Sequence, residues 1–155
     1  MQAEPNPQEE QTYLWSDVWL LLAILMAPRE GPADLRSILA AGDYLEHAIF
    51  RFEEMEGGLF RLTRGGYVEE VAGGFVPTEM AQEMFRRIAS QTRRRRALRE
   101  AVAHAIGVQR PGPSVQAQAA ENGHRYPSLT RSRYEEAVRR YLQKENSRDD
   151  SSHCE

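Results

Sequence analysis

Cysteine and lysine are almost absent from this sequence. The single cysteine among the 155 residues is Cys154, so an internal disulfide framework and a cysteine-rich zinc site are both excluded. Nineteen of the twenty cationic residues are arginine. GC-rich codon usage also produces such a bias, so the number of arginines does not by itself indicate phosphate binding. With 41% hydrophobic and 28% charged residues, the composition predicts one globular domain with an appendage.

The sequence also lacks a long apolar run. The longest one covers residues 18–27, about half the length that a membrane-spanning helix needs. A secretory signal would carry basic residues before such a run, whereas the charges that precede it here are all acidic. We therefore expect a buried core helix in a cytoplasmic protein that has no membrane partner.

The net charge of −3 is unevenly distributed. Residues 1–50 carry 2 basic against 8 acidic residues, residues 51–100 carry 10 against 8, and residues 101–155 carry 8 against 7. This balance excludes a uniformly basic nucleic-acid coat protein. Any nucleic-acid-binding role requires a local basic patch.

Hydrophobic periodicity predicts two helices at the start of the domain. The first, capped by Ser16 and ending at Ala27, is apolar around most of its circumference, which is typical of a central helix. The second is capped by Asp34 and runs to about residue 46. Because Gly42 weakens its middle, a break there followed by a new start is the alternative.

A third helix and a hairpin follow. Over residues 52–63, apolar residues recur at i, i+3, i+7 and i+10, which predicts one buried stripe made of Phe52, Met55, Leu59 and Leu62. Two extended runs, 67–71 and 75–77, then flank a glycine-rich turn and predict a β-hairpin. Thr78 opens the next helical region, which is either one helix as far as Ile106 or two.

The predicted organisation has six parts. The parts are a disordered lead (1–12), a first domain (13–90), a helical extension (91–107), a linker (108–130), an amphipathic helix (131–144) and a polar tail (145–155). The amphipathic helix is expected to open with a capping box of Ser132 and Glu135.

The order of three helices, a glycine-tipped hairpin and a further helix carries a family resemblance. Residues 58–70 (GLFRLTRGGYVEE) and 75–78 (FVPT) resemble the recognition helix and wing of MarR/PadR-type transcriptional regulators. The expected fold class is therefore mainly α with a small β-hairpin, a winged helix-turn-helix domain with a C-terminal helical extension. The resemblance implies a transcriptional regulator that binds double-stranded DNA as a homodimer, with dimer surfaces after residue 79 and on the helix 133–144.

The same resemblance implies that the helix 52–63 enters the major groove. Its face opposite the apolar stripe contains Glu53, Glu54, Gly57, Arg61 and Arg64. Arginine can bind guanine through two hydrogen bonds, and clustered arginines can bind phosphates, although a run of charges is as often a solvated helix surface. The candidate DNA-binding residues are Arg61 and Arg64 for the groove, and Arg51, Arg93, Arg94, Arg95 and Arg96 for phosphates.

Acidic residues in the same region favour a different function. Two glutamates lie at the N-terminal end of the presumed recognition helix, where they would repel phosphates. The wing carries Glu69 and Glu70, and no cation lies between Arg64 and Arg86. The alternative prediction is a winged-helix protein–protein interaction adaptor that does not bind DNA.

Residue patterns for catalysis are lacking. The four histidines, at positions 47, 104, 124 and 153, have no metal-ligand spacing, and the glycine pairs are not followed by a phosphate-loop lysine. We therefore expect a protein that is not an enzyme and that carries no metal and no cofactor.

Overall fold

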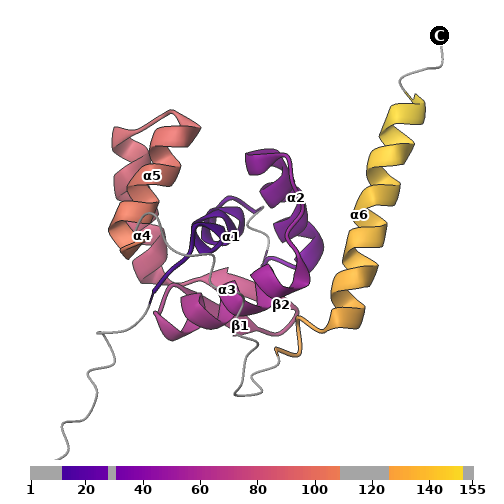
Figure 1. Ribbon diagram of the computed structural model, residues 1–155, viewed down its shortest axis with the longest axis horizontal. Coiled ribbons are helices and arrows are strands. Elements are labelled where there is room, and N and C mark those ends of the chain that lie inside the picture. The colour runs from indigo at the N-terminus through magenta and orange to yellow at the C-terminus, as the bar shows by residue number, and fades with distance from the viewer. Residues whose placement is uncertain (1–11, 28–30, 109–125, 152–155) are drawn as a thin grey trace, which may run out of the picture.

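The computed structural model describes residues 12–27, 31–108 and 126–151. Over these ranges the chain is mainly helical with one small antiparallel hairpin, consistent with a winged helix, so the predicted fold class is confirmed (Figure 1). The elements are α1 (Trp15–Met26), α2 (Leu35–Glu46), α3 (Phe52–Arg64), β1 (Val68–Val71), β2 (Gly74–Pro77), α4 (Glu79–Gln91), α5 (Arg95–Ile106) and α6 (Arg131–Ser151).

Helix α1 occupies the centre of the molecule, as its apolar circumference predicts. It contacts α2, α3, α5 and β2, and seven of its side chains between Val18 and Leu25 belong to the buried core. The expected Ser16 cap is wrong. The helix begins two residues earlier, with Leu14 as its N-cap residue, because the Asp17 carboxylate accepts the backbone N–H of Leu14 at 2.8 Å and closes the first turn from inside the helix. No helix in the described ranges has the length and apolar character needed to cross a bilayer.

Helix α2 is continuous through Gly42, so the alternative break there does not occur. The Asp34 cap is confirmed, since its Oδ1 accepts the N–H of Ser37 at 2.8 Å. Packing explains the glycine at position 42 in the middle of the helix, because the Phe50 ring occupies the space that a Cβ would take. Trp19 stacks on that ring and donates its indole N–H to the carbonyl of Gly42 at 2.9 Å.

The predicted stripe of α3 faces inward, with Met55, Leu59 and Leu62 fully buried. The hairpin is also confirmed, and Gly73 forms its turn with a φ of +90°. The structure contains one further β-bridge, which the two extended runs of the hairpin did not predict. Ala33, which precedes α2, exchanges two backbone hydrogen bonds with Phe75 at 2.8 and 3.0 Å. This bridge attaches the α1–α2 connection to the hairpin.

The region after the hairpin forms two helices, α4 and α5, and Thr78 caps the first of them. Helix α6 packs along α2. Two expectations about α6 are wrong. Thr130, rather than Ser132, caps its first turn by accepting the N–H of Arg133, and the helix continues to residue 151 because no glycine or proline ends it at 144. Residues 1–11 of the expected lead and residues 109–125 of the expected linker lie outside the described residues. Leu129, which also belongs to the expected linker, is almost fully buried.

We predict that Gly42→Ala lowers the free energy of unfolding by about 1–3 kcal/mol, because the new methyl group overlaps the Phe50 ring in a packed core. Ala40→Ser on the exposed face of the same helix is the matched control, because it also adds one heavy atom. There the added atom meets solvent, so the free energy of unfolding is expected to change by less than about 0.5 kcal/mol. Urea denaturation followed by circular dichroism measures both changes. Equal effects of the two substitutions would contradict the packing explanation.

Candidate functional site

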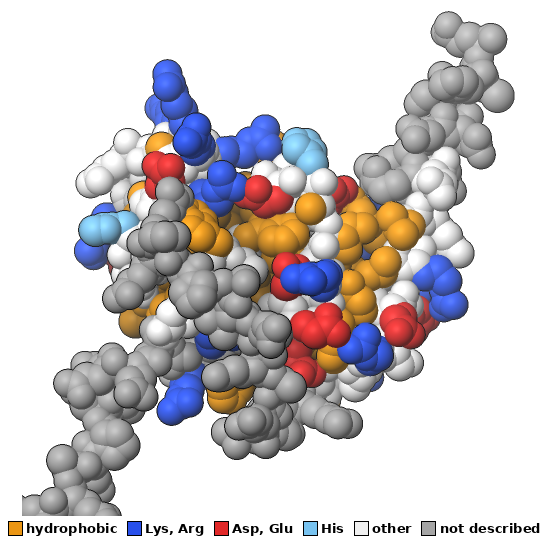
Figure 2. All heavy atoms as spheres, viewed as in Figure 1, with side chains coloured by type: hydrophobic (Ala, Val, Ile, Leu, Met, Phe, Trp, Pro, Cys, Tyr) orange, Lys and Arg blue, Asp and Glu red, His pale blue; other side chains and the backbone are white. Residues whose placement is uncertain are grey.

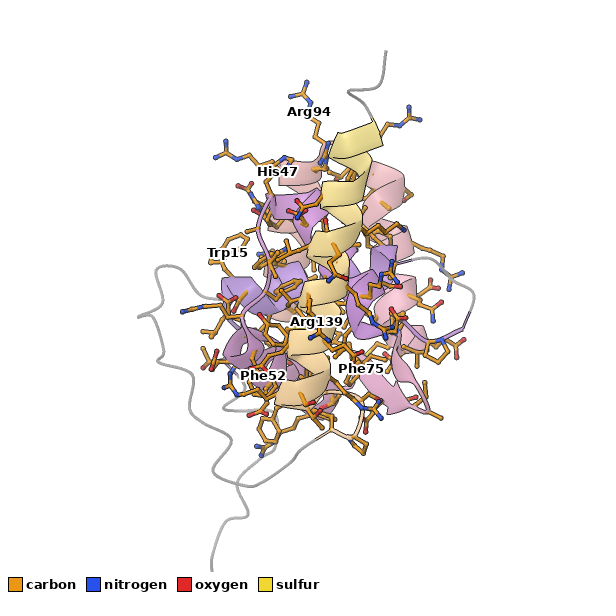
Figure 3. All side chains as sticks on the ribbon, turned by 90° about the vertical axis from the view of Figure 1, so that its right-hand side faces the viewer. Trp15, His47, Phe52, Phe75, Arg94 and Arg139 are labelled. Carbon is orange, nitrogen blue, oxygen red and sulfur yellow. The ribbon has the colours of Figure 1, made fainter. Side chains whose placement is uncertain are left out.

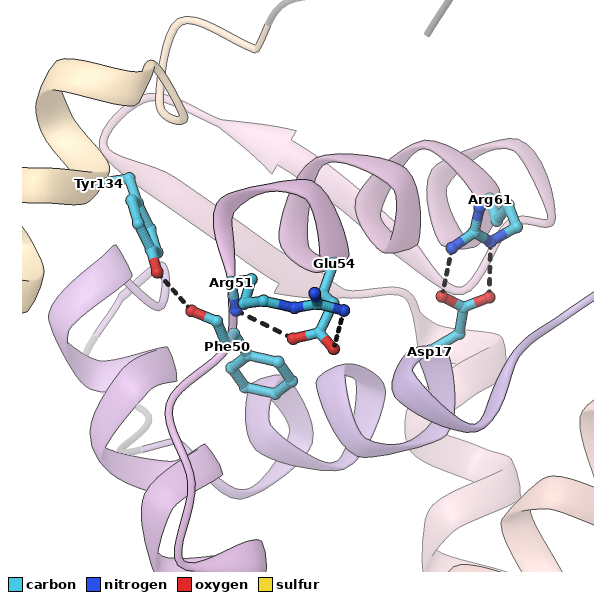
Figure 4. Close-up of polar contacts among 6 residues, drawn as sticks. All are labelled: Asp17, Phe50, Arg51, Glu54, Arg61 and Tyr134. Atoms are coloured by element: carbon cyan, nitrogen blue, oxygen red, sulfur yellow. Dashed lines mark hydrogen bonds and ion pairs between the residues drawn. The ribbon is translucent and has the colours of Figure 1, made fainter. Parts of the chain in front are cut away.

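The N-terminal end of α3 is closed by its own residues. The backbone N–H of Arg51 donates to Glu54 Oε2 at 2.9 Å, and the guanidinium of Arg51 lies 3.3 Å from the other oxygen of the same carboxylate (Figure 4). This arrangement is a capping box, which satisfies an N–H group at the start of the helix. Arg51 is therefore the N-cap residue of α3, and its side chain stays largely exposed. The Glu54 carboxylate is engaged in closing this end of the helix.

Arg61 turns back toward the core. Its Nε and Nη2 atoms lie 2.6 and 2.9 Å from the two carboxylate oxygens of Asp17 on α1. Asp17 is completely buried and the Arg61 side chain is 16% exposed. Gly58 is needed beside the pair, since a Cβ at that position would come 2.7 Å from Leu20 and 3.1 Å from Asp17. The expectation that Arg61 points away from the core is wrong, because a buried carboxylate requires a cationic partner.

Tyrosines surround the same end of α1. The Tyr13 ring meets the Tyr67 ring edge-on, with 5.8 Å between their centroids. Burial, the neighbouring Tyr67 and the Asp17 charge raise the pKa of Tyr13 to about 12. The phenol therefore stays neutral at physiological pH, and Asp17, paired with the partly buried Arg61, is the one buried charged residue within the described ranges.

The segment before α6 lies against the C-terminal half of α3 and the hairpin. The hydroxyls of Tyr126 and Thr63 share a hydrogen bond of 2.7 Å, and the Tyr126 ring packs edge-on against Phe75 at 5.6 Å. The backbone N–H of Ser128 donates to Glu70 at 3.0 Å. Burial raises the pKa of Tyr126. The α3–hairpin surface, defined here by Phe52, Glu53, Thr63, Glu70 and Phe75, thus contacts polypeptide along its length.

The first turn of α6 contacts the other end of that surface. Arg131 donates to Glu53 at 3.0 Å, and its guanidinium lies 4.5 Å from the centroid of the Phe52 ring. The Tyr134 hydroxyl donates to the carbonyl oxygen of Phe50 at 2.6 Å. A hydrogen bond from its own backbone and the bond from Arg131 lower the pKa of Glu53. Further along α6, the Tyr141 hydroxyl donates to an Asp43 carboxylate oxygen on α2 at 2.5 Å.

The four consecutive arginines 93–96 lie elsewhere. Figure 1 places the turn between α4 and α5 at the opposite end of the molecule from α3 and the hairpin. Basic side chains project from this end in Figure 2, and Arg94 points into solvent near the end that carries His47 in Figure 3. Arg95 instead reaches α2, where it donates to the Tyr44 carbonyl at 3.2 Å and lies 4.7 Å from the centroid of that ring.

The candidate DNA-binding residues therefore form two separate groups. Arg51, Arg61 and Arg64 belong to α3, whereas Arg93–Arg96 occupy the α4–α5 turn and the start of α5. Of the first group, Arg64 is the exposed residue that carries no capping or core contact. In the second, all four side chains are exposed, and Arg96 lies 3.7 Å from Glu100. A single duplex cannot contact both groups in the orientation that the recognition-helix resemblance implies.

The contacts of the Tyr126–Tyr134 segment were not predicted from the sequence. The segment lies mostly within a stretch that was expected to be a linker, and its aromatic and cationic residues had no predicted partner. Asp17 did carry a signal, because a carboxylate in an otherwise apolar helix requires a partner. Within the described ranges, no group of acidic, histidine or cysteine side chains is arranged to hold a metal ion.

The chain matches no family model, no curated protein and no solved structure. Its function must therefore be inferred from the chemistry of the two surfaces: the α3–hairpin surface covered by polypeptide, and the arginine-rich turn.

We predict that Arg61→Ala lowers the free energy of unfolding by about 3–5 kcal/mol, because it leaves Asp17 charged and unpaired in the core. Arg64→Ala, three residues further along the same helix, removes an exposed arginine and is expected to change stability by less than about 0.5 kcal/mol. Thermal and chemical denaturation compare the two variants. If Arg61→Ala were as mild as Arg64→Ala, the pair would not be a structural requirement.

Proposed function

We propose that this chain is a winged-helix protein–protein interaction adaptor whose α3–hairpin surface binds polypeptide. The observation that supports the proposal is the occupation of this surface by residues 126–134 of the same chain. Four hydrogen bonds and two aromatic contacts distribute the binding over both ends of α3 and over the hairpin. A surface that is complementary to one polypeptide segment is suited to bind another of similar chemistry.

The charges of this surface also favour a polypeptide partner over DNA. Glu53 and Glu69 are exposed, and Glu70 accepts a hydrogen bond from the covering segment. Arg61, the cation best placed to read a base, neutralises Asp17 instead. A duplex that approached α3 would meet acidic side chains at the wing and at the start of the helix, and it would first have to displace the covering segment.

The contacts also describe the partner that such a surface accepts. A tyrosine fits between α3 and β2, an arginine pairs with Glu53 above the Phe52 ring, and a second tyrosine reaches the carbonyl of Phe50. We therefore expect a partner segment with two aromatic residues about eight positions apart, with a cation between them, as Tyr126, Arg131 and Tyr134 are in this chain. In the absence of that partner, the chain's own segment 126–134 occupies the site.

A labelled peptide of residues 126–151 tests the proposal. We expect it to bind the full-length double variant Arg131→Glu/Tyr134→Ala at least about tenfold more tightly than the unaltered chain. In the unaltered chain the tethered segment competes at an effective concentration in the millimolar range. Fluorescence anisotropy measures binding, and a peptide of scrambled sequence is the control.

The outcome that would overturn the adaptor proposal is equal binding of the scrambled and native peptides by a double variant that keeps its helical circular dichroism spectrum. Binding of the native peptide that is lost when its own Tyr126 is replaced by alanine would support the assigned contacts with Thr63 and Phe75.

A second candidate function is binding of the DNA phosphate backbone by the arginine-rich turn. The specific observation in its favour is that Arg93, Arg94 and Arg96 are all exposed at one end of the molecule. These cations could bind phosphates without base recognition, and such binding weakens steeply as the salt concentration rises. The homodimer, the transcriptional role and the cytoplasmic location implied above remain predictions.

Chromatography on random duplex DNA at low salt separates the two candidates. We expect Arg64→Ala to leave elution unchanged, because α3 does not read DNA, whereas Arg93→Ala/Arg94→Ala removes any retention that the unaltered chain shows. Each cation removed from a phosphate contact lowers the slope of log affinity against log salt by about 1. If Arg64→Ala abolished retention, α3 would contact DNA and the adaptor proposal would be wrong.

A further inference from the structure

A groove lies between α1, the C-terminal end of α2 and the first turns of α5, on the opposite side of the fold from the α3–hairpin surface. Its volume is about 290 Å³. Four apolar side chains from these three helices form its walls: Trp19, Leu22, Leu45 and Leu98. Trp19 is held rigidly, because it stacks on Phe50 and donates its indole N–H to a backbone carbonyl.

The rim of the groove is cationic. Arg95, Arg96 and Arg99 line it from α5, and Glu46 is the one acidic residue among the lining side chains. Glu46 is already ion-paired with Arg99, so its charge is compensated. Arg96 lies 3.7 Å from Glu100, which is outside the lining, and such an exposed ion pair is weak. Arg95 forms no ion pair within the described residues and is held over the Tyr44 ring beside the opening.

We propose that this groove binds a small amphipathic monoanion, with its apolar body against Trp19 and Leu98 and its carboxylate at the arginine rim. The apolar walls offer inorganic phosphate or sulfate no hydrogen-bond partners beyond the rim. A neutral apolar molecule would leave Arg95 without a counter-ion. The volume is at the lower limit of small-molecule sites and is suited to a ligand of about two fused rings.

The chain offers a direct probe of this groove. It has two tryptophans, Trp15 and Trp19, so its ¹H–¹⁵N spectrum contains two indole signals, of which that of Trp19 reports on the groove wall. We expect 2-naphthoate to shift the Trp19 signal of the full-length protein saturably. The neutral analogue 2-naphthamide and sodium sulfate are expected to cause no saturable shift.

Charge reversal at the rim supplies the matched comparison. Arg96→Glu is expected to weaken 2-naphthoate binding about fivefold, the upper range for an exposed ion pair. Arg87→Glu on α4 changes the net charge equally but lies outside the groove lining, and it is expected to leave binding unchanged. Both residues are exposed, so neither substitution disturbs the core.

Any of four results would overturn the proposal: no saturable shift with 2-naphthoate, equal binding of 2-naphthamide, an equal shift with sulfate, or equal loss of binding in both charge-reversal variants. The adaptor proposal is unaffected by these outcomes, because the covering segment and the α3–hairpin surface contribute no residue to the groove.

Discussion

The buried pair between Asp17 and Arg61 is the constraint on which the arrangement of the helices depends. Asp17 lies on the central helix, completely removed from solvent, and it accepts hydrogen bonds from Arg61 and from the backbone of Leu14. A carboxylate in such a place is tolerated only with a well-placed cation. The pair therefore sets how α3 lies against α1, and Gly58 is required because any side chain there would collide with Leu20.

This structural role has a functional consequence. A winged helix that reads DNA presents cations from its third helix, and here the most favourably placed cation is used inside the fold. Glu53 and Glu69 are exposed on this surface beside Arg51 and Arg64, and part of the surface is covered by the segment from Tyr126 to Tyr134. The contacts of this surface with the chain's own C-terminal segment are the reason why we favour the adaptor function.

Four consecutive exposed arginines, Arg93–Arg96, lie at the other end of the molecule, around the turn between α4 and α5. Arg95 and Arg99 connect α5 to the end of α2 through Tyr44 and Glu46. Between these connections lies the groove assigned to an amphipathic anion. The two ends of the fold are therefore chemically distinct: one is acidic and aromatic, the other cationic and apolar.

Local patterns were sufficient to predict much of the fold. The apolar stripe of α3, the Asp34 and Thr78 caps and the glycine-tipped hairpin all depend on residues close together in sequence, and the structure confirms each of them. The Ser16 and Ser132 caps failed because another residue within the same turn satisfied the backbone N–H groups first, Asp17 in one case and Thr130 in the other.

The candidate site was much less predictable. Its contacts join residues that are far apart in the sequence: Asp17 with Arg61, Thr63 with Tyr126, and Glu53 with Arg131. Helical periodicity places Arg61 on the outer face but does not reveal that its long side chain bends back to a buried carboxylate. The sequence by itself determined the helices, the hairpin and the inward stripe, because these follow from short-range periodicity and turn chemistry. Only the tertiary structure decided which charges are neutralised internally and which surface the C-terminal segment covers, because those depend on distances that no local pattern contains.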